Sequence, residues 1–184
     1  MIDVLFLTMP GNGNLLSALC GEGGAFVDNA MEVPSIDMDY DGWERSLRGR
    51  NTRLYLSVCV EEPVEKPLWA VDGWVGSLGT LVANSRKVVA VTCERTRWTY
   101  DMAKSGSGSV QALKNFHSKL DLTLRKVAGQ DAMVVDRDHL DGRRNTLSAL
   151  SRYSGLQMRP LPREPRHDKT LFNEIFLPPE KKKE

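Results

Sequence analysis

Cysteine, proline and long apolar runs are all scarce in this chain of 184 residues. It has 3 Cys and 9 Pro, and no apolar stretch approaches the roughly 20 residues that a membrane span requires. These absences argue against a disulfide scaffold, a collagen-like chain and a membrane-spanning protein. With 41% hydrophobic and 27% charged residues, the composition instead predicts one soluble globular domain, long enough to bury a core without disulfides or a structural metal.

An excess of charge of either sign is also missing. The chain has 25 Lys and Arg against 24 Asp and Glu, which gives a formal net charge of +1. Such a balance provides no global field for gathering nucleic acid or an anionic membrane, so the sequence argues against both as partners. Recognition of an anion must then come from the local placement of a few groups.

The three cysteines are widely spaced and form no CxxC pair. The sequence therefore predicts no metal site built from thiolates. Cys59 and Cys93 fall in apolar runs, which indicates buried, reduced thiols. The chain also begins Met-Ile-Asp, without the basic segment of a secretory signal, so a cytoplasmic location is expected.

Short apolar runs alternate along the chain with segments of helical periodicity. The runs with strand character are residues 4–8, 25–27, 54–60, 87–93 and 132–135. The segments with helical spacing begin at Leu15 and then cover residues 43–50, 74–82, 110–127 and 141–155. This alternation predicts an α/β fold, a three-layer sandwich around a mostly parallel sheet.

The end of the chain differs in composition from the rest. Asp141 is the expected N-cap of the last helix and Gly155 its C-terminal stop. From Arg159 onward, proline and charged residues dominate. We therefore expect an α/β domain over residues 1–158, followed by an arm and charged tail over residues 159–184.

The turn after the first strand is the first candidate for a ligand site. In open α/β sheets, ligands bind beyond the carboxyl ends of the strands, and the sequence Met-Pro-Gly-Asn-Gly-Asn-Leu-Leu over 9–16 falls there. Glycines allow close approach of the backbone to a phosphate. The segment lacks the Lys and Ser/Thr of the GxxxxGK[ST] loop, which argues against a metal-nucleotide site. Phosphate binding and a plain tight turn both remain open on this evidence.

Four segments, taken in order, resemble motifs of the sulfotransferase family. Residues 8–19 are similar to its 5′-phosphosulfate loop, and the matching positions are Pro10, Gly13, Asn14 and Leu16. Residues 65–67 (Glu-Lys-Pro) resemble its Lys-x-Pro element, and residues 87–95 resemble the strand that ends in the arginine of its 3′-phosphate motif. Residues 133–140, followed by 153–156, resemble its closing pattern. The resemblance implies a P-loop NTPase-like, sulfotransferase-like fold.

The resemblance also implies a ligand and a site. The expected donor is 3′-phosphoadenosine 5′-phosphosulfate (PAPS), with no metal. Donor-binding positions carried over from the motifs are Gly11, Asn12, Gly13, Asn14, Leu15, Leu16, Arg95 and Ser105. Glu32 is the expected general base and Lys66 the cation that stabilises the leaving phosphate. The chain departs from the family at Gly11, where Arg or Lys is usual, and at Asn12, where Ser is usual.

Two other functions compete with sulfuryl transfer. A P-loop kinase of a nucleotide or nucleoside is suggested by Asp136, which ends the last apolar run in the manner of a Walker-B aspartate. A non-catalytic binding protein with the same fold is suggested by the lost loop cation. The acceptor of a sulfotransferase reaction could be a small molecule, a glycan or a peptide. An anionic acceptor would suit the basic run Arg45, Arg48, Arg50 and Arg53.

Overall fold

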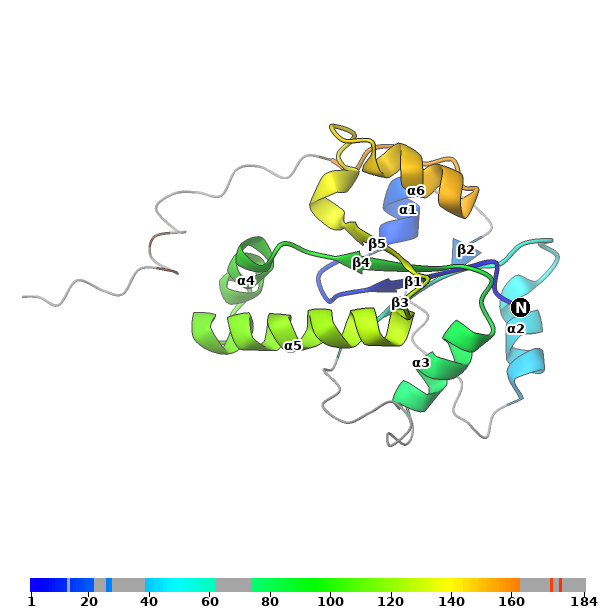
Figure 1. Ribbon diagram of the computed structural model, residues 1–184, viewed down its shortest axis with the longest axis horizontal. Helices are drawn as coiled ribbons and strands as arrows, with labels where there is room; N and C mark the ends of the chain where they lie inside the picture. Colours follow the sequence, from blue (N-terminus) through cyan, green and yellow to red (C-terminus); the bar gives the residue numbers. More distant parts are fainter. Residues whose placement is uncertain are drawn as a thin grey trace, which may run out of the picture.

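Five parallel strands form the centre of the molecule, in the order β2-β3-β1-β4-β5 (Figure 1). The computed structural model describes residues 1–12, 14–21, 26–27, 39–61, 74–162, 173 and 176, with the backbone alone for 74–77. The strands are β1 (Val4–Thr8), β2 (Phe26–Val27), β3 (Tyr55–Cys59), β4 (Val88–Thr92) and β5 (Met133–Asp136). All four neighbouring pairs are parallel, which confirms the predicted α/β class and its parallel sheet.

Helices lie on both faces of this sheet (Figure 1). They are α1 (Leu15–Cys20), α2 (Tyr40–Arg48), α3 (Trp74–Ala83), α4 (Arg95–Lys104), α5 (Val110–Ala128), α6 (Thr146–Ser154) and a 3-10 turn, η2 (Arg137–Leu140). In Figure 1, α1 and α6 lie on one side of the strands, and α3 and α5 lie on the other. This layering arises because a strand and its parallel neighbour must be joined by a crossover, which here is helical.

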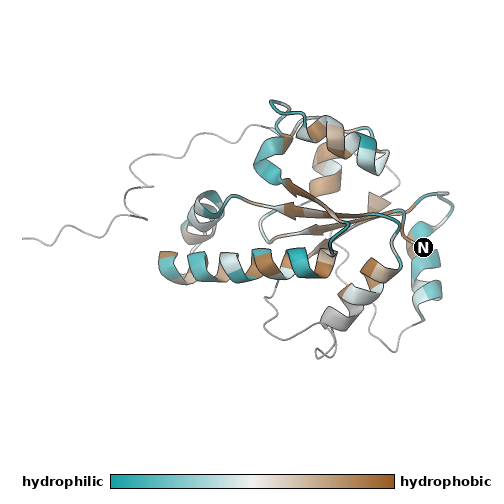
Figure 2. Ribbon diagram, in the orientation of Figure 1, coloured by the Kyte–Doolittle hydropathy of each residue, from teal (hydrophilic) through white to brown (hydrophobic). Residues whose placement is uncertain are grey.

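Two hydrophobic clusters hold the layers together. Side chains of β1 and β4 alternate between them, so Leu5 and Ala90 pack with α3 and α5, whereas Phe6 and Val89 pack with α1 and α6. All five residues of β1 and of β4 are buried. The sheet is accordingly hydrophobic along its whole depth in Figure 2, while the helices carry polar outer faces. Continuous apolar strands of this kind are typical of sheets covered on both sides.

The longest helix agrees closely with its sequence pattern. The spacing of apolar residues predicts a helix over 110–127, and α5 runs from Val110 to Ala128. Ser109 caps its start by accepting a hydrogen bond from the Ala112 amide, and Gly129 follows its last turn. Leu120 and Leu124, one turn apart, are fully buried. A stripe of this spacing fixes which face of a helix meets the sheet.

Helix α4 was not among the predicted elements. The expected strand over 87–93 ends in the structure at Thr92, and the chain turns into α4 at Arg95. Glu94 caps this helix, because its carboxylate accepts hydrogen bonds from the amides of Thr96 and Arg97 at 2.9 and 2.8 Å. Arg95 therefore lies in the first turn of a helix, where its side chain is exposed, and does not end a buried strand.

The start of the last helix also differs from the prediction. The structure begins α6 at Thr146, after Asn145, and Asp141 instead stands at the end of η2. The Asp141 carboxylate caps a turn by accepting a hydrogen bond from the Arg143 amide at 3.0 Å. Acidic residues stabilise turns in the same way as helix starts, so the residue type alone does not distinguish them. Gly155 ends α6 at φ 74°, as predicted.

The beginning of the predicted arm is packed on the domain. The Arg159 amide donates to Leu19 O at 2.7 Å, and its guanidinium Nε donates to Ala18 O. The Leu161 amide donates to Leu140 O at 2.9 Å, and the Leu161 side chain is buried. The packed unit thus extends past the expected boundary at 158 to at least Leu161. In the part of the chain that the structure describes, no helix is both long enough and apolar enough to cross a bilayer.

Candidate functional site

The strand order reverses at β1, and this places a crevice at the carboxyl edge of the sheet. From β1 the chain crosses over one face through α1, while from the adjacent β4 it crosses over the other face through α4 and α5 (Figure 1). Two neighbouring strands whose connections leave on opposite faces open a space between their carboxyl ends. In α/β proteins this position is the usual place for a ligand.

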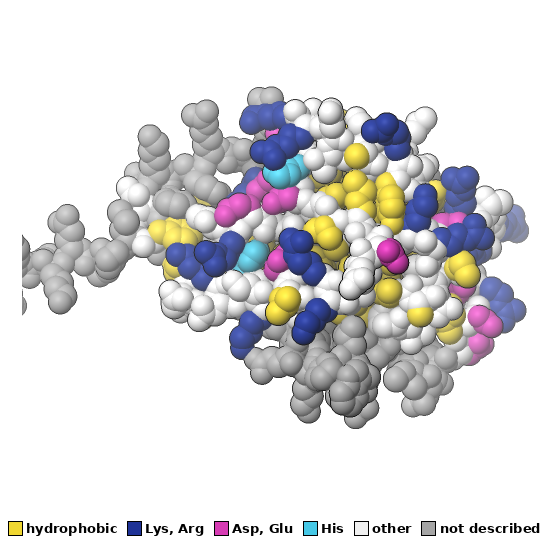
Figure 3. All heavy atoms as spheres, in the orientation of Figure 1, with side chains coloured by type: hydrophobic (Ala, Val, Ile, Leu, Met, Phe, Trp, Pro, Cys, Tyr) yellow, Lys and Arg dark blue, Asp and Glu magenta, His cyan; other side chains and the backbone are white. Residues whose placement is uncertain are grey.

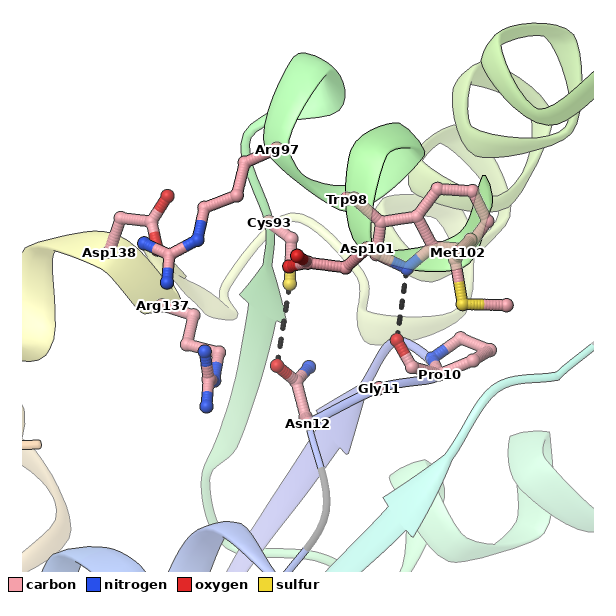
Figure 4. Close-up of a pocket in the computed structure, with 10 residues that line it drawn as sticks. All are labelled: Pro10, Gly11, Asn12, Cys93, Arg97, Trp98, Asp101, Met102, Arg137 and Asp138. Carbon is pink, nitrogen blue, oxygen red and sulfur yellow. Dashed lines mark hydrogen bonds and ion pairs between the residues drawn. The ribbon is translucent and has the colours of Figure 1, made fainter. Parts of the chain in front are cut away.

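A small pocket lies at this point (Figure 4). Its lining comes from the segments that follow β1, β4 and β5, and consists of Pro10, Gly11, Asn12, Cys93, Arg97, Trp98, Asp101, Met102, Arg137 and Asp138. The cavity volume is about 50 Å³. Because one water needs roughly 10–15 Å³ of such space, the pocket has room for a few waters or one tetrahedral oxyanion, but not for a whole nucleotide.

Asn12 lines the pocket and carries a buried hydrogen-bond donor without a partner in the described part of the chain. Its side chain is buried, with only 6% of the residue exposed. The amide oxygen accepts a hydrogen bond from the Cys93 thiol, with Oδ1 and Sγ 3.3 Å apart (Figure 4). The amide nitrogen Nδ2 has no partner among the described residues. A buried donor without a partner costs about 1–3 kcal/mol, a cost that a bound water or ligand can offset.

The Cys93 thiol is the hydrogen-bond partner of this amide. Burial, with smaller contributions from Asp138 and Asp136 and an opposing effect of Arg137, raises the pKa of Cys93 to about 12. The thiol is therefore protonated at neutral pH and donates to Asn12 Oδ1, an orientation of the amide that leaves Nδ2 without this partner. Cys93 is half-buried and, like Cys20 and Cys59, forms no disulfide.

Two arginines and two aspartates supply the charges of the lining. The Arg97 guanidinium Nη1 lies 2.5 Å from Asp138 Oδ1, so α4 is joined to η2 across the mouth of the pocket. Arg137, on the turn after β5, is the second cation. Burial raises the pKa of Asp138 above its usual value, and the neighbouring Arg97 only partly offsets this effect.

Trp98 holds the loop after β1 against α4. Its indole Nε1 donates to Pro10 O at 2.9 Å, as Figure 4 shows, and only 4% of the residue is exposed. Its ring stacks on Phe116 of α5, with centroids 6.2 Å apart, and contacts His117 at 5.3 Å. His117 is buried, and its Nε2 lies 2.9 Å from Cys93 O. This histidine therefore has a structural role, since it holds the backbone of Cys93 in place.

Glu94 occupies the amino-terminal turn of α4 beside the pocket. Burial raises its pKa, but the backbone hydrogen bonds from Thr96 and Arg97 outweigh burial, and the net pKa lies below the usual value. A carboxylate with a depressed pKa stabilises the fold above its unfolded-state pKa, and this contribution is lost as pH falls through the folded-state pKa. The amides at this helix start are thus already engaged by the chain's own anion.

Replacement of Glu94 by glutamine should therefore lower stability at neutral pH only. We expect Glu94→Gln to reduce the free energy of unfolding by about 0.3–1 kcal/mol at pH 7, the contribution of a carboxylate at a helix start. As the pH falls through the lowered folded-state pKa of Glu94, the difference should shrink toward zero. Urea unfolding over a series of pH values from neutral to acidic measures this, with Glu61→Gln as a control of equal charge change. A loss that does not depend on pH would contradict the cap.

The structure gathers only part of the sequence-predicted site. Gly11 and Asn12 line the pocket, and Asn14 is exposed beside α1. Leu15 and Leu16 are buried in the cluster beneath α6, so their side chains face away from a ligand. Arg95 and Ser105 are exposed and do not line the pocket; Ser105 ends α4 and bonds to Met102 O. Gly13, Glu32 and Lys66 lie outside the described residues.

Gly11, where the sulfotransferase motif usually has Arg or Lys, has a backbone conformation that favours glycine. Gly11 has φ +87°, in the left-handed region that residues with a Cβ rarely adopt. Arginine or lysine at this position would therefore strain the turn, although nothing lies within 4 Å of a Cβ placed there. In this chain the cations of the pocket come instead from Arg97 and Arg137.

Four charged residues of the pocket were missed by the sequence prediction. Arg97, Asp101, Arg137 and Asp138 lie on α4 and η2, two elements that have no marked apolar periodicity. One available signal was position: all four follow strands whose carboxyl ends meet at one edge of a parallel sheet. The sequence prediction took Arg95 as a donor-binding residue from the resemblance to the sulfotransferase motif. The arginine that lines the pocket is Arg97, two residues later.

The basic run over 45–53 lies at the other end of the sheet. Arg50 and Arg53 lead into the amino end of β3, whereas the pocket is at the carboxyl ends. Arg48 is engaged by Glu44 at 2.7 Å and by Asp3 at 3.6 Å. In Figure 3, cationic side chains are interspersed with carboxylates on the visible face. This run therefore does not contribute to binding in the pocket.

Comparison of the chain with protein-family models, with curated proteins and with solved structures gives no match. The fold and the site geometry therefore carry the functional argument. Within the described ranges, no group of three or more His, Cys, Asp or Glu side chains is arranged to hold a metal ion.

Proposed function

We propose that the pocket binds the oxyanion of a phosphorylated nucleotide, and that this nucleotide is PAPS or its product, adenosine 3′,5′-bisphosphate. The single observation that carries the proposal is the buried Asn12 amide in the lining of this pocket, whose Nδ2 has no partner in the described structure and which shares the lining with Arg97 and Arg137. A donor and two guanidinium groups around a space of this size suit a tetrahedral anion.

Three further observations support the choice of ligand. The pocket lies where the connections that leave β1 and β4 go to opposite faces of the sheet, the position at which α/β sheets bind ligands. Its small volume fits the phosphoryl part of a nucleotide, with the remainder outside. The order of the sequence motifs resembles that of sulfotransferases over most of the chain. The sulfotransferase-like class of the fold, and the enzyme activity, are parts of this proposal.

The proposed chemistry assigns a role to each group. In sulfuryl transfer, the bond between sulfur and the phosphate oxygen of the donor breaks, and a bond forms between sulfur and the acceptor oxygen or nitrogen. The acceptor's proton passes to a base, for which Glu32 is the sequence-based candidate. Lys66, the sequence-based candidate, would stabilise the charge that grows on the leaving phosphate, and Asn12 Nδ2, Arg97 and Arg137 would bind a phosphoryl group of the donor.

The ligand can be tested by thermal shift. Adenosine 3′,5′-bisphosphate at about 100 times its dissociation constant should add roughly 2.7 kcal/mol to the free energy of unfolding. AMP, which lacks the 3′-phosphate, should stabilise the protein less at the same concentration. Equal shifts with both nucleotides would contradict PAPS as the donor. The absence of a shift with any nucleotide would contradict the nucleotide site itself.

A kinase would respond to a different ligand. Asp136 lies at the carboxyl end of β5, as a metal-organising aspartate would, but its carboxylate accepts a hydrogen bond from the Asp138 amide at 2.9 Å and caps η2. If ATP stabilises the protein only in the presence of Mg²⁺, and more strongly than the bisphosphate does, the kinase is the better assignment.

A further inference from the structure

The pocket contains acceptors as well as donors of hydrogen bonds. Asp101, on the same helix as Arg97, is part of the lining and points toward the centre of the view in Figure 4. Asp138 is engaged by Arg97, at 2.5 Å. Within the part of the chain that is described, the Asp101 side chain takes part in no hydrogen bond or ion pair. A carboxylate therefore faces the space in which the proposed function places an anion.

A carboxylate at this place distinguishes two kinds of oxyanion. Ionised aspartate can only accept hydrogen bonds, so it repels a sulfate group, which carries no proton near neutral pH. A phosphate monoester has a second pKa of about 6, and its monoanion keeps one P–OH group that can donate. Donation to a carboxylate is a charge-assisted hydrogen bond and is correspondingly strong.

We infer that Asp101 makes the pocket selective for a protonated phosphate monoester over a sulfate group. The inference rests on the proposed function, because it requires that the pocket binds an oxyanion. It deepens that function by naming the part of the nucleotide that the pocket holds. Asn12 Nδ2 and the two arginines provide the donors, and Asp101 accepts the remaining proton of the ligand.

This selectivity has a consequence for PAPS. The molecule carries one phosphate monoester, on the 3′-oxygen, and one phosphosulfate, on the 5′-oxygen, which has no proton to donate. The pocket would then hold the 3′-phosphate and leave the phosphosulfate outside it. Arg97 would serve the 3′-phosphate, two residues beyond the Arg95 of the sequence prediction.

Methyl phosphate and methyl sulfate form a matched pair of probes. Near pH 6, about half of the phosphate ester carries the same single charge as the sulfate ester, and the two monoanions differ mainly by the P–OH proton. Titration followed through the indole N–H resonance of Trp98, which lines the pocket, reports binding of each. We expect methyl phosphate to bind roughly 10- to 30-fold more tightly, the lower part of the range for a hydrogen bond to a charged group.

Asp101→Asn should remove this preference, because an amide can donate to sulfate as well as accept from phosphate. Asp131→Asn, an exposed aspartate before β5, changes the charge equally but lies at the other edge of the sheet and should keep the preference. Equal binding of the two probes to the native protein, or an unchanged preference in Asp101→Asn, would overturn the inference and leave the oxyanion pocket standing. If neither probe binds, the proposed function is wrong as well.

Discussion

Replacement of Asn12 by leucine should weaken nucleotide binding roughly 10- to 100-fold, since the variant loses one hydrogen bond from a neutral donor to a charged ligand. The same change should raise the free energy of unfolding by about 1 kcal/mol, because the buried Nδ2 has no partner in the described structure of the free protein. Calorimetric titration with adenosine 3′,5′-bisphosphate and urea unfolding measure the two effects.

A second variant separates the donor from the volume of the side chain. Asn12→Asp keeps the size but places a carboxylate oxygen at the position of Nδ2. We expect it to lose ligand binding as Asn12→Leu does, without the gain in stability, since a buried carboxylate near Asp138 adds a cost of its own. Retained affinity in both variants would show that Asn12 does not contact the ligand and would contradict the proposed oxyanion site.

The largest effect on stability is expected at Trp98. Trp98→Ala should lower the free energy of unfolding by about 3–5 kcal/mol, the usual cost of removing a large buried aromatic side chain. It would remove the ring contacts with Phe116 and His117 as well as the hydrogen bond to Pro10 O. Chemical denaturation monitored by circular dichroism measures the loss.

The milder variant Trp98→Phe tests whether this residue also positions the ligand loop. Phenylalanine keeps much of the apolar contact but cannot donate to Pro10 O, so the stability loss should be near 1–2 kcal/mol. Affinity for the bisphosphate should nevertheless fall several-fold, because Gly11 and Asn12 follow directly on Pro10. If affinity is unchanged in a folded Trp98→Phe protein, the indole has a structural role only.

The parts of the fold that the sequence predicts are those with strong local patterns. The apolar run of β4 and the stripe of α5 each specify burial residue by residue, and both elements lie within one or two residues of their predicted bounds. Helix α4 lacks such a pattern, because Trp98, Thr99 and Tyr100 are buried in succession. Its burial depends on α5, with which it packs, and a contact between two helices is not visible in one short segment.

The candidate site likewise contains residues that the sequence predicts and residues that it does not. Gly11 and Asn12 were predicted as part of a ligand loop, since a glycine-rich turn after the first strand is a local feature, and they line the pocket. Arg97, Asp101, Arg137 and Asp138 depend on the order of β1, β4 and β5 in the sheet, which sequence spacing does not give. The predicted roles of Glu32 and Lys66 stay predictions.

The complete burial of β1 and β4 has a consequence for how strand register is specified. A strand with one buried and one solvent-exposed face is held in register because a shift by one residue would expose its apolar side chains. Both faces of β1 and β4 are buried, so a shift of register by one residue would expose few apolar side chains. Interactions at the strand ends must therefore specify the register. The Thr92 hydroxyl bonded to Val135 O, and the Trp98 indole bonded to Pro10 O, act at the carboxyl edge. The contacts that build the pocket therefore also select one alignment of the sheet, so mutations that reshape the ligand site would also change which strand pairings compete during folding.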